Sequence, residues 1–431
     1  MHRSFPVRGA DEPTRRGFLT GAAQGLLGVS LAPGLDRLLG TAAHEGPVPT
    51  AHRVIYLYLS GGMSHVDTFD PKDDREVMGD TTTIPTAADG IRIGSHLEHT
   101  ARVMDRVAVV NSMWSNQGAH VQGRYFLHTG YGLRGTIRHP SLGAWLSHLR
   151  GPANPTLPPH VAIGGDQYAA SAGFFASAHA PLPLGDPEAG LQNAALPRGV
   201  DDPAFDRRMA RLKAMNQAFQ ERHGDRLASA YDEAYDQAVE LMRSRDLEAF
   251  AIDAEAAAIR DAYGRNRFGQ GCLLARRLIE HDVRFVEVVS GGWDMHNEVF
   301  DALEDRVPEF DRAFAALIAD LDARGLLETT LVVVATEFGR TPKINGTRNG
   351  RDHHPKAFSC LLAGGGIRGG VRHGRTDERG EEVVEGRTTV PDFNATIAMA
   401  LGLPLDQVVH SPTRRPFTVA DKGRPLTELF A

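Results

Sequence analysis

Five short apolar runs, each closed by Gly, Asn, Ser or an acidic residue, most constrain how this chain can fold. Val, Ile and Leu dominate these runs, which is typical of strands buried on both faces of a parallel sheet. The runs span residues 53–59, 106–110, 283–289, 331–335 and 358–363. Because helical patterns separate several of them, the sequence predicts an α/β fold with a mostly parallel sheet.

The stretches between these runs differ in character. Residues from about 203 to 280 are Ala-rich, charged and nearly free of proline, with apolar residues at helical spacing, so they predict a helical segment. Residues 306–327 predict an amphipathic helix that leads into the next strand. Between about 151 and 203, Pro and Gly are dense and periodicity is lost, which predicts surface loops.

Residues 1–43 predict an export signal rather than folded structure. Arg15 and Arg16 stand before a mildly apolar run at 19–31, and small residues around Thr41 suit signal peptidase. This pattern is typical of a twin-arginine signal, so we expect passage through the twin-arginine translocase and a periplasmic or secreted product. The run is shorter than the roughly 18 residues of a membrane span, which argues against a permanent anchor. A chance Arg-Arg pair is the weaker alternative.

Composition excludes several classes of protein. The chain has 42% apolar and 23% charged residues, which suits a soluble globular protein, and residues 44–431 fit a single large α/β domain. A net charge of −7 without a long basic run argues against nucleic-acid binding. Cys272 and Cys360 form no CxxC pair, so two buried thiols are expected, with one disulfide as the alternative.

Residues that can bind metals follow the predicted strands. Carboxyl ends of parallel strands meet at one edge of a sheet, where α/β proteins place their sites. A mixed carboxylate and imidazole set without thiolates favours a divalent metal such as zinc, manganese or iron. The alternative is that these residues are helix caps and surface side chains. The candidates are Asp67, Asp294, His296, Glu337, Asp352, His353 and His354.

Another candidate segment follows the run at 106–110. A strand that ends near Asn111, then a polar loop and a helix, is a natural oxyanion pocket because helix N-termini present free amides. His120 and Arg124 lie one helical turn apart and share a face, so both side chains could meet one anionic group. A solvated helix face is the alternative interpretation.

Four motifs carry a resemblance to a known family. They are LSGGMSHVDTFDP at 59–71, GWDMH at 292–296, EFGRTP at 337–342 and GRDHH at 350–354. With further matching runs at 268–277 and 362–370, the mature chain resembles the bacterial domain-of-unknown-function 1501 family over essentially its whole length. That family is frequently exported by the twin-arginine route and is placed in the alkaline phosphatase and sulfatase superfamily.

The resemblance implies a three-layer α/β/α sandwich like that of alkaline phosphatase, with the helical segment inserted before the second half of the chain. It also implies one or two metals at the carboxyl edge of the sheet. Asp294, His296 and either His353 or His354 match the order of the first metal's ligands. Glu337 matches the second metal's carboxylate, although Phe338 replaces its partner. Asp67 is the nearest substitute for the acid that follows the first strand.

The nucleophile departs from the superfamily pattern. His120 stands at the nucleophile position of sulfatases, and it cannot be converted to their formylglycine. Three options stay open: a histidine nucleophile, a metal-activated water with His120 as base, or no catalysis. Ser64, Ser112 and Ser115 are nearby candidates if the alignment slips.

The sequence thus predicts an exported, metal-binding, hydrolase-like protein that acts on a phosphate or sulfate ester of a small molecule, glycan or lipid. His120 and Arg124 are expected at the oxyanion. The alternative is a non-catalytic binding or structural protein of the cell envelope that retains the same fold.

Overall fold

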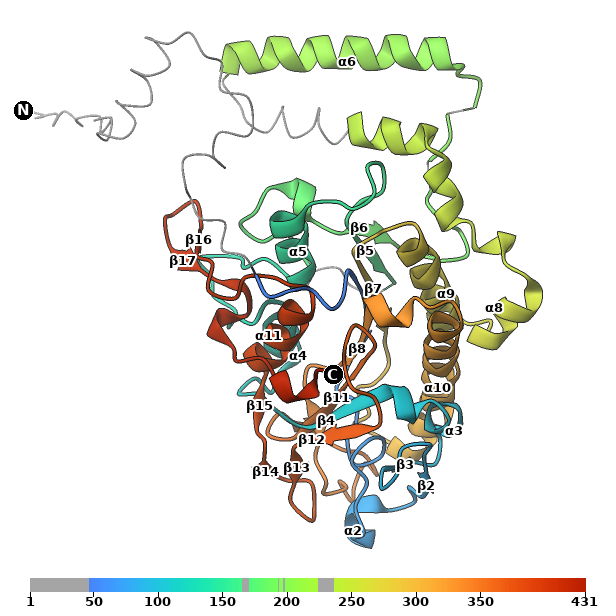
Figure 1. The fold of residues 1–431 in the computed structure, drawn as a ribbon, viewed down its shortest axis with the longest axis vertical. Helices are drawn as coiled ribbons and strands as arrows, with labels where there is room; N and C mark the ends of the chain where they lie inside the picture. The colour runs from blue at the N-terminus through green and yellow to red at the C-terminus, as the bar shows by residue number, and fades with distance from the viewer. Residues whose placement is uncertain (1–45, 165–169, 193, 197, 224–235) are drawn as a thin grey trace, which may run out of the picture. The chain divides into compact units, whose positions relative to one another are not determined.

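A nine-stranded sheet organises the chain in the computed structural model, which describes residues 46–164, 170–192, 194–196, 198–223 and 236–431. The strand order is β12-β4-β11-β8-β1-β7-β5-β6, and β15 lies beside β4 (Figure 1). The predicted export signal at 1–43 lies outside the described residues. The strands are β1 (Arg53–Leu59), β4 (Val107–Trp114), β5 (His160–Ile163), β6 (Leu182–Leu184), β7 (Phe285–Ser290), β8 (Thr330–Ala335), β11 (Phe358–Ala363), β12 (Val371–His373) and β15 (Thr388–Thr389).

One strand runs against all the others. Each neighbouring pair in the sheet is parallel except the two pairs that β11 makes with β4 and β8. The carboxyl ends of the parallel strands therefore share an edge with the amino end of β11. Residues that follow β4, β7 and β8 meet residues that precede β11 at this edge.

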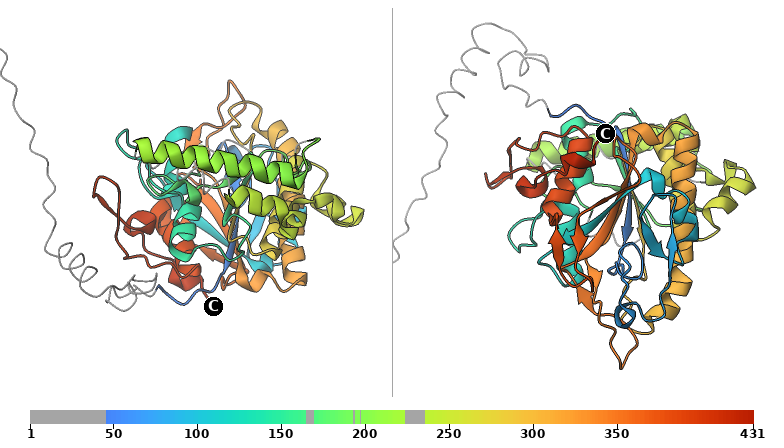
Figure 2. Two further views of the ribbon diagram at one scale, coloured as in Figure 1. Left: turned by 90° about the horizontal axis from the view of Figure 1, so that it is seen from above. Right: turned by 60° about the horizontal axis from the view of Figure 1, so that its bottom comes forward.

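Helices cover both faces of the sheet, as the two views in Figure 2 show. Side chains alternate along β1: Ile55 and Leu57 pack in the core on one face, and Val54 and Tyr56 pack in the core on the other. The first core includes α9 (Arg267–Glu280) and α10 (Val299–Ala323). The second core includes α4 (His120–Thr129), α5 (Leu142–Arg150) and α11 (Val390–Ala400). This arrangement confirms the predicted α/β/α sandwich with a mostly parallel sheet.

All five predicted strands are present, and β4 continues beyond its predicted end at 110 as far as Trp114. The helix predicted at 306–327 is α10, which begins earlier, at Val299. The segment at 203–280 contains α6 (Asp202–His223), α8 (Ala257–Tyr263) and α9, although residues 224–235 lie outside the description.

The prediction of surface loops for 151–203 was wrong in two places, because β5 and β6 belong to the sheet. Both strands are only three or four residues long, too short for an apolar pattern to stand out between prolines and glycines. Pro183 lies inside β6, which is tolerated because this strand is at the edge of the sheet.

The two cysteines are free and buried. Cys272 packs in the core of α9 and α10, whereas Cys360 packs on the opposite face of the sheet. Burial raises the pKa of the Cys360 thiol to about 12 and raises that of Cys272 as well. The expected pair of buried thiols is therefore confirmed.

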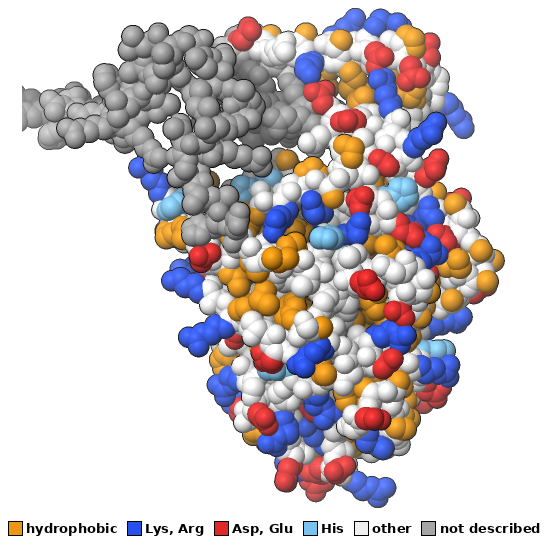
Figure 3. Space-filling model, in the orientation of Figure 1, with side chains coloured by type: hydrophobic (Ala, Val, Ile, Leu, Met, Phe, Trp, Pro, Cys, Tyr) orange, Lys and Arg blue, Asp and Glu red, His pale blue; other side chains and the backbone are white. Residues whose placement is uncertain are grey.

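The surface is mixed in charge. On the face shown in Figure 3, Lys and Arg side chains are interspersed with Asp and Glu side chains. None of the helices in the described part of the chain combines the length and apolar character needed to cross a membrane.

Candidate metal centre

Four imidazole and carboxylate side chains converge at the edge of the sheet where the parallel strands end. His120 opens α4, which follows β4, and Asp294 and His296 lie in the loop after β7. His353 belongs to the two-residue strand β10 (His353–His354), which pairs with β9 (Gly339–Arg340) and precedes β11. We call His120, Asp294, His296 and His353 the His–Asp cluster.

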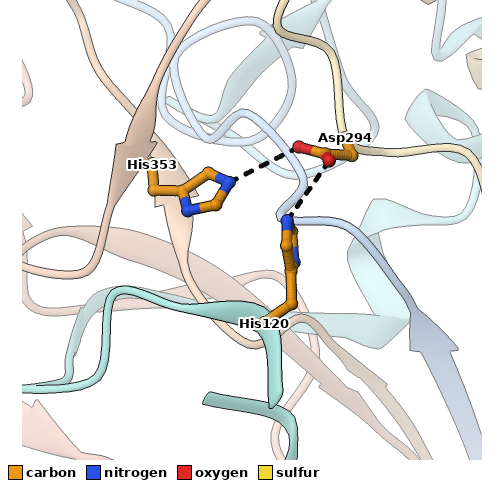
Figure 4. Close-up of side chains that lie close together, drawn as sticks. All are labelled: His120, Asp294 and His353. Atoms are coloured by element: carbon orange, nitrogen blue, oxygen red, sulfur yellow. Dashed lines mark ion pairs between the residues drawn. The ribbon is translucent and has the colours of Figure 1, made fainter. Parts of the chain in front are cut away.

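Asp294 is the centre of this cluster. His120, Asp294 and His353 each place one ligand atom within 4.8 Å of the others (Figure 4). Asp294 Oδ2 lies 3.3 Å from His120 Nε2, and Asp294 Oδ1 lies 3.5 Å from His353 Nε2. His296 Nε2 lies 3.1 Å from Asp294 Oδ1 and 3.0 Å from His353 Nε2. All three imidazoles thus turn Nε2 toward the same carboxylate.

The other ring nitrogen of each imidazole contacts an oxygen that can only accept. These contacts join His120 Nδ1 to Glu337 Oε1 (2.8 Å), His353 Nδ1 to the carbonyl oxygen of Gly118 (2.8 Å) and His296 Nδ1 to Asp352 Oδ1 (3.1 Å). Each Nδ1 therefore carries the proton, and in the neutral ring Nε2 keeps its lone pair. Outer-sphere contacts of this kind orient the histidine ligands of metal sites.

The cluster fits a cation because its lone pairs oppose one another. His120 Nε2 is buried and makes no hydrogen bond, although it lies close to a carboxylate oxygen. His296 Nε2 and His353 Nε2 likewise face each other. A shared cation would satisfy these atoms together, and nitrogen and carboxylate donors suit zinc, manganese or iron. The side chain of Asp294 is 48% exposed, so the centre is open to a substrate.

A buried arginine holds Asp294. The Arg340 guanidinium donates to Asp294 Oδ1 and to the carbonyl oxygens of Gly61 and Gly62. Burial alone would raise the pKa of Asp294, but the hydrogen bond and charge of Arg340 hold this pKa below its ordinary value. Gly61 has φ +128°, and a Cβ there would lie 2.4 Å from the amide nitrogen of Asp294. The close approach of the β1 and β7 loops therefore requires glycine at this position.

Glu337 orients the ring of His120 through a hydrogen bond to Nδ1. Its fully buried carboxylate accepts hydrogen bonds from His120 Nδ1, from Tyr58 Oη at 2.9 Å and from the amide of Gly61 at 3.0 Å. The hydrogen bond that His120 donates to Glu337 raises the pKa of His120. Glu337 thus lies one contact away from the His–Asp cluster rather than inside it.

Two of the predicted metal ligands, Asp67 and His354, contact residues outside the His–Asp cluster. Asp67 forms a fully buried ion pair with Arg351, at 2.7 Å from Oδ2 to Nε, and also accepts from Thr81. His354 follows His353 on β10, where successive side chains point to opposite sides. Its Nε2 donates to the carbonyl oxygen of Glu381 at 2.7 Å. The structure does not bring either residue into the His–Asp cluster.

The serines considered as alternative nucleophiles are also engaged elsewhere. Ser64 donates to Asp67, and Ser112 shares a hydrogen bond with Thr388 at 3.2 Å. Ser115 accepts from the amide of Gln117 at 3.0 Å. Each of the three side chains is buried, and none of these bonds reaches the His–Asp cluster.

Arg124, one turn after His120 on α4, lines a pocket beside the cluster. The pocket has a volume of about 390 Å³, and its wall includes Tyr58, Ser60, Arg124, Arg267 and Gly291. The sequence does not point to Arg267, because the other residues that line this pocket come from distant parts of the chain. Gly118 was also missed, because it contributes only a backbone oxygen and its residue type gives no signal.

Comparisons with known proteins give a family match. The family model described as "Protein of unknown function (DUF1501)" matches residues 51–430. A comparison with curated proteins finds no match.

Solved structures with some similarity include the PsFucS1 sulfatase from Pseudoalteromonas sp., at 14% identity over 90% of this chain and 75% of that chain, with a TM-score of 0.39. The lipoteichoic acid synthase LtaP from Listeria monocytogenes is 10% identical over 89% and 78%, with a TM-score of 0.39. Alkaline phosphatase from the Antarctic bacterium TAB5 is 12% identical over 75% and 95%, with a TM-score of 0.33. At this level of similarity the three structures do not assign a function to this chain.

Proposed function

This chain belongs to the DUF1501 family of proteins of unknown function, and we propose that it is an exported, metal-dependent hydrolase of a phosphate or sulfate ester. The observation that carries the proposal is the set of three imidazoles fixed at Nδ1, with each Nε2 directed at Asp294. The Arg-Arg motif near the N-terminus supports export, and hence a substrate of the cell envelope or the exterior.

The His–Asp cluster would hold the cation. A divalent zinc, manganese or iron ion supplies Lewis acidity to an ester oxygen and lowers the pKa of water. Glu337 and Asp352 fix the rings of His120 and His296, and Arg340 keeps Asp294 ionised. These contacts hold the donor atoms in place before any ligand arrives, which lowers the cost of assembling the centre.

Water is the proposed nucleophile. The described side chains that meet in the cluster are imidazoles and a carboxylate, with the Arg340 guanidinium behind them, and they offer neither hydroxyl nor thiol. His120 directs Nε2 at Asp294, which suits a ligand better than a group that must attack phosphorus or sulfur. We propose that Arg124, one turn further along α4, meets the oxyanion of the ester.

Elemental analysis of the mature protein, purified after export by its own signal, tests the proposal. We expect about one zinc, manganese or iron ion per chain, and its loss in the double variant Asp294→Ala, His296→Ala. The matched control is His52→Ala, Asp301→Ala, which removes the same residue types from exposed positions and should keep the metal.

Hydrolysis of 4-nitrophenyl phosphate and 4-nitrophenyl sulfate by the same preparations completes the test. Activity should follow metal content across the wild type, the double variant and the control. Wild-type protein that carries no metal and cleaves neither ester would overturn the proposal. That result would favour the alternative of a non-catalytic binding protein of the cell envelope.

A further inference from the structure

The pocket beside the His–Asp cluster has the chemistry of an anion site. Arg124, Arg267, Tyr58 and Ser60 are among the residues that line it, and the two arginines are the charged residues of this set. Among the residues that the structure describes, those that line it include no carboxylate. Arg side chains recognise carboxylate, sulfate and phosphate groups through paired, charge-assisted hydrogen bonds.

Hydrogen bonds through Glu337 connect the pocket to the cluster. Tyr58 Oη donates to Glu337, and the same carboxylate accepts from His120 of the cluster. The carboxylate of Glu337 accepts hydrogen bonds on the far side of Tyr58, and Glu337 is not among the residues that line the pocket. On the opposite side, Gly291 lies in the loop that carries Asp294. A ligand that reaches the cluster therefore has this pocket as its neighbour.

Arg267 is held in place for such a ligand. It is the first residue of α9, and its guanidinium donates from Nε to the carbonyl oxygen of Gly185 at 3.2 Å. This backbone contact restrains a long side chain that is otherwise exposed, which reduces the entropy lost on binding. Arg267 begins α9 and Arg124 lies in α4, and these two helices pack on opposite faces of the sheet.

We infer that this pocket binds a second oxyanion of the substrate, one that is not hydrolysed. The inference rests on the proposed function and narrows it: the substrate is an ester that carries at least two anionic groups. The reacting group meets the His–Asp cluster, and the second group, a sulfate, phosphate or carboxylate, meets the guanidinium of Arg267.

Calorimetric titration with small probes tests this inference. The probes are benzenesulfonate, benzene-1,3-disulfonate and 3-sulfobenzoate, so that the second group is absent, a sulfonate or a carboxylate. Metal-loaded wild-type protein should bind the two dianions about tenfold more tightly than the monoanion. The ratio between the two dianions shows which oxyanion the pocket prefers.

The substitution Arg267→Gln should abolish this preference while the metal content stays unchanged. The matched control is Arg265→Gln, which removes an equal charge two residues away, where the guanidinium contacts Asp261 instead of the pocket. The control should keep at least half of the preference, because exposed charges at a distance are screened by salt.

Titration of the metal-stripped protein distinguishes the anion site from the proposed metal-dependent hydrolysis. Binding of the disulfonate that depends on Arg267 should persist there, since the pocket residues are not ligands of the cluster. If metal and ester hydrolysis are found but Arg267→Gln binds all probes as the wild type does, the inference is overturned and the proposed function stands. If metal and hydrolysis are absent but the dependence on Arg267 remains, the proposed function fails and the anion site stands.

Discussion

Replacing Glu337 by glutamine should weaken metal binding by about five- to twelvefold while leaving the protein folded. The carboxylate of Glu337 accepts hydrogen bonds from His120 Nδ1, Tyr58 Oη and the amide of Gly61, and a longer one, at 3.5 Å, from Thr336 Oγ1. Glutamine has nearly the same shape but loses the charge, and its amide nitrogen must face one of these donors. The ring of His120 then loses its charged acceptor.

Only a hydrogen bond whose strength differs between the metal-free and the metal-bound protein affects the metal affinity. Hydrogen bonds to a charged group contribute about 1.5–3 kcal/mol, against about 0.5–1.5 kcal/mol for neutral pairs. The losses at Tyr58 and Gly61 occur with or without metal and cancel in the affinity. The loss at His120 does not cancel, because this ring would carry the metal. The charged and neutral ranges differ by about 1.0–1.5 kcal/mol, which corresponds to about five- to twelvefold in the dissociation constant.

A zinc titration against a chelator of known affinity measures the effect, with thermal unfolding of the metal-free proteins as the check on folding. The matched control is Glu287→Gln. Glu287 is also buried and also contacts a histidine of α4, but its partner, at 3.0 Å, is His128, outside the cluster. This control should unfold more easily and keep its zinc affinity. Equal affinities for wild type and a folded Glu337→Gln would refute the reasoning.

Three further predictions concern buried groups outside the His–Asp cluster and their effect on stability and reactivity. The pKa of Glu287 is held below its ordinary value and that of His128 above its own, because their mutual attraction outweighs burial. The stabilisation by Glu287 is therefore lost as pH falls through the lowered pKa, and that by His128 is lost as pH rises through the raised pKa, so urea unfolding from about pH 4 to 9 should show a maximum between these limits. The two buried cysteine thiols should resist iodoacetamide in the native protein and react after denaturation, as counted by mass spectrometry. Gly143→Ala should lower the free energy of unfolding by about 1–3 kcal/mol, because the new Cβ would lie 2.5 Å from the buried ring of His160, whereas Gly132→Ala meets nothing within 4 Å and should change it little.

The edge of the sheet where the candidate residues gather could be predicted from the sequence, because apolar runs followed by polar turns place their ends together. The choice between His353 and His354 could not. It depends on the pairing of β10 with β9, a ladder of two residues that leaves no periodic pattern. One step along β10 reverses the direction of the side chain, and this step alone brings His353 rather than its neighbour to Asp294.

Asp67 shows a second limit of sequence reasoning. An acidic residue in a glycine-rich turn after a strand suits either a metal ligand or an ion pair, and the local sequence is the same in both cases. The residue that decides is Arg351, which lies far along the chain and is buried against Asp67. The residue types near Asp67 contain no information about this partner.

The late position of β10 and β11 in the chain also sets an order in time. The segments that carry His120, Asp294 and His296 are synthesised well before β10 and β11, so His353 is the last member of the His–Asp cluster to leave the ribosome. The next strand along the chain is β11, which lies between β4 and β8. Without β11, the sheet would be two separate pieces. A cation held by all four residues would therefore be bound only by chains that have been synthesised at least as far as β10, and metal content would report that this part of the chain has reached the edge of the sheet.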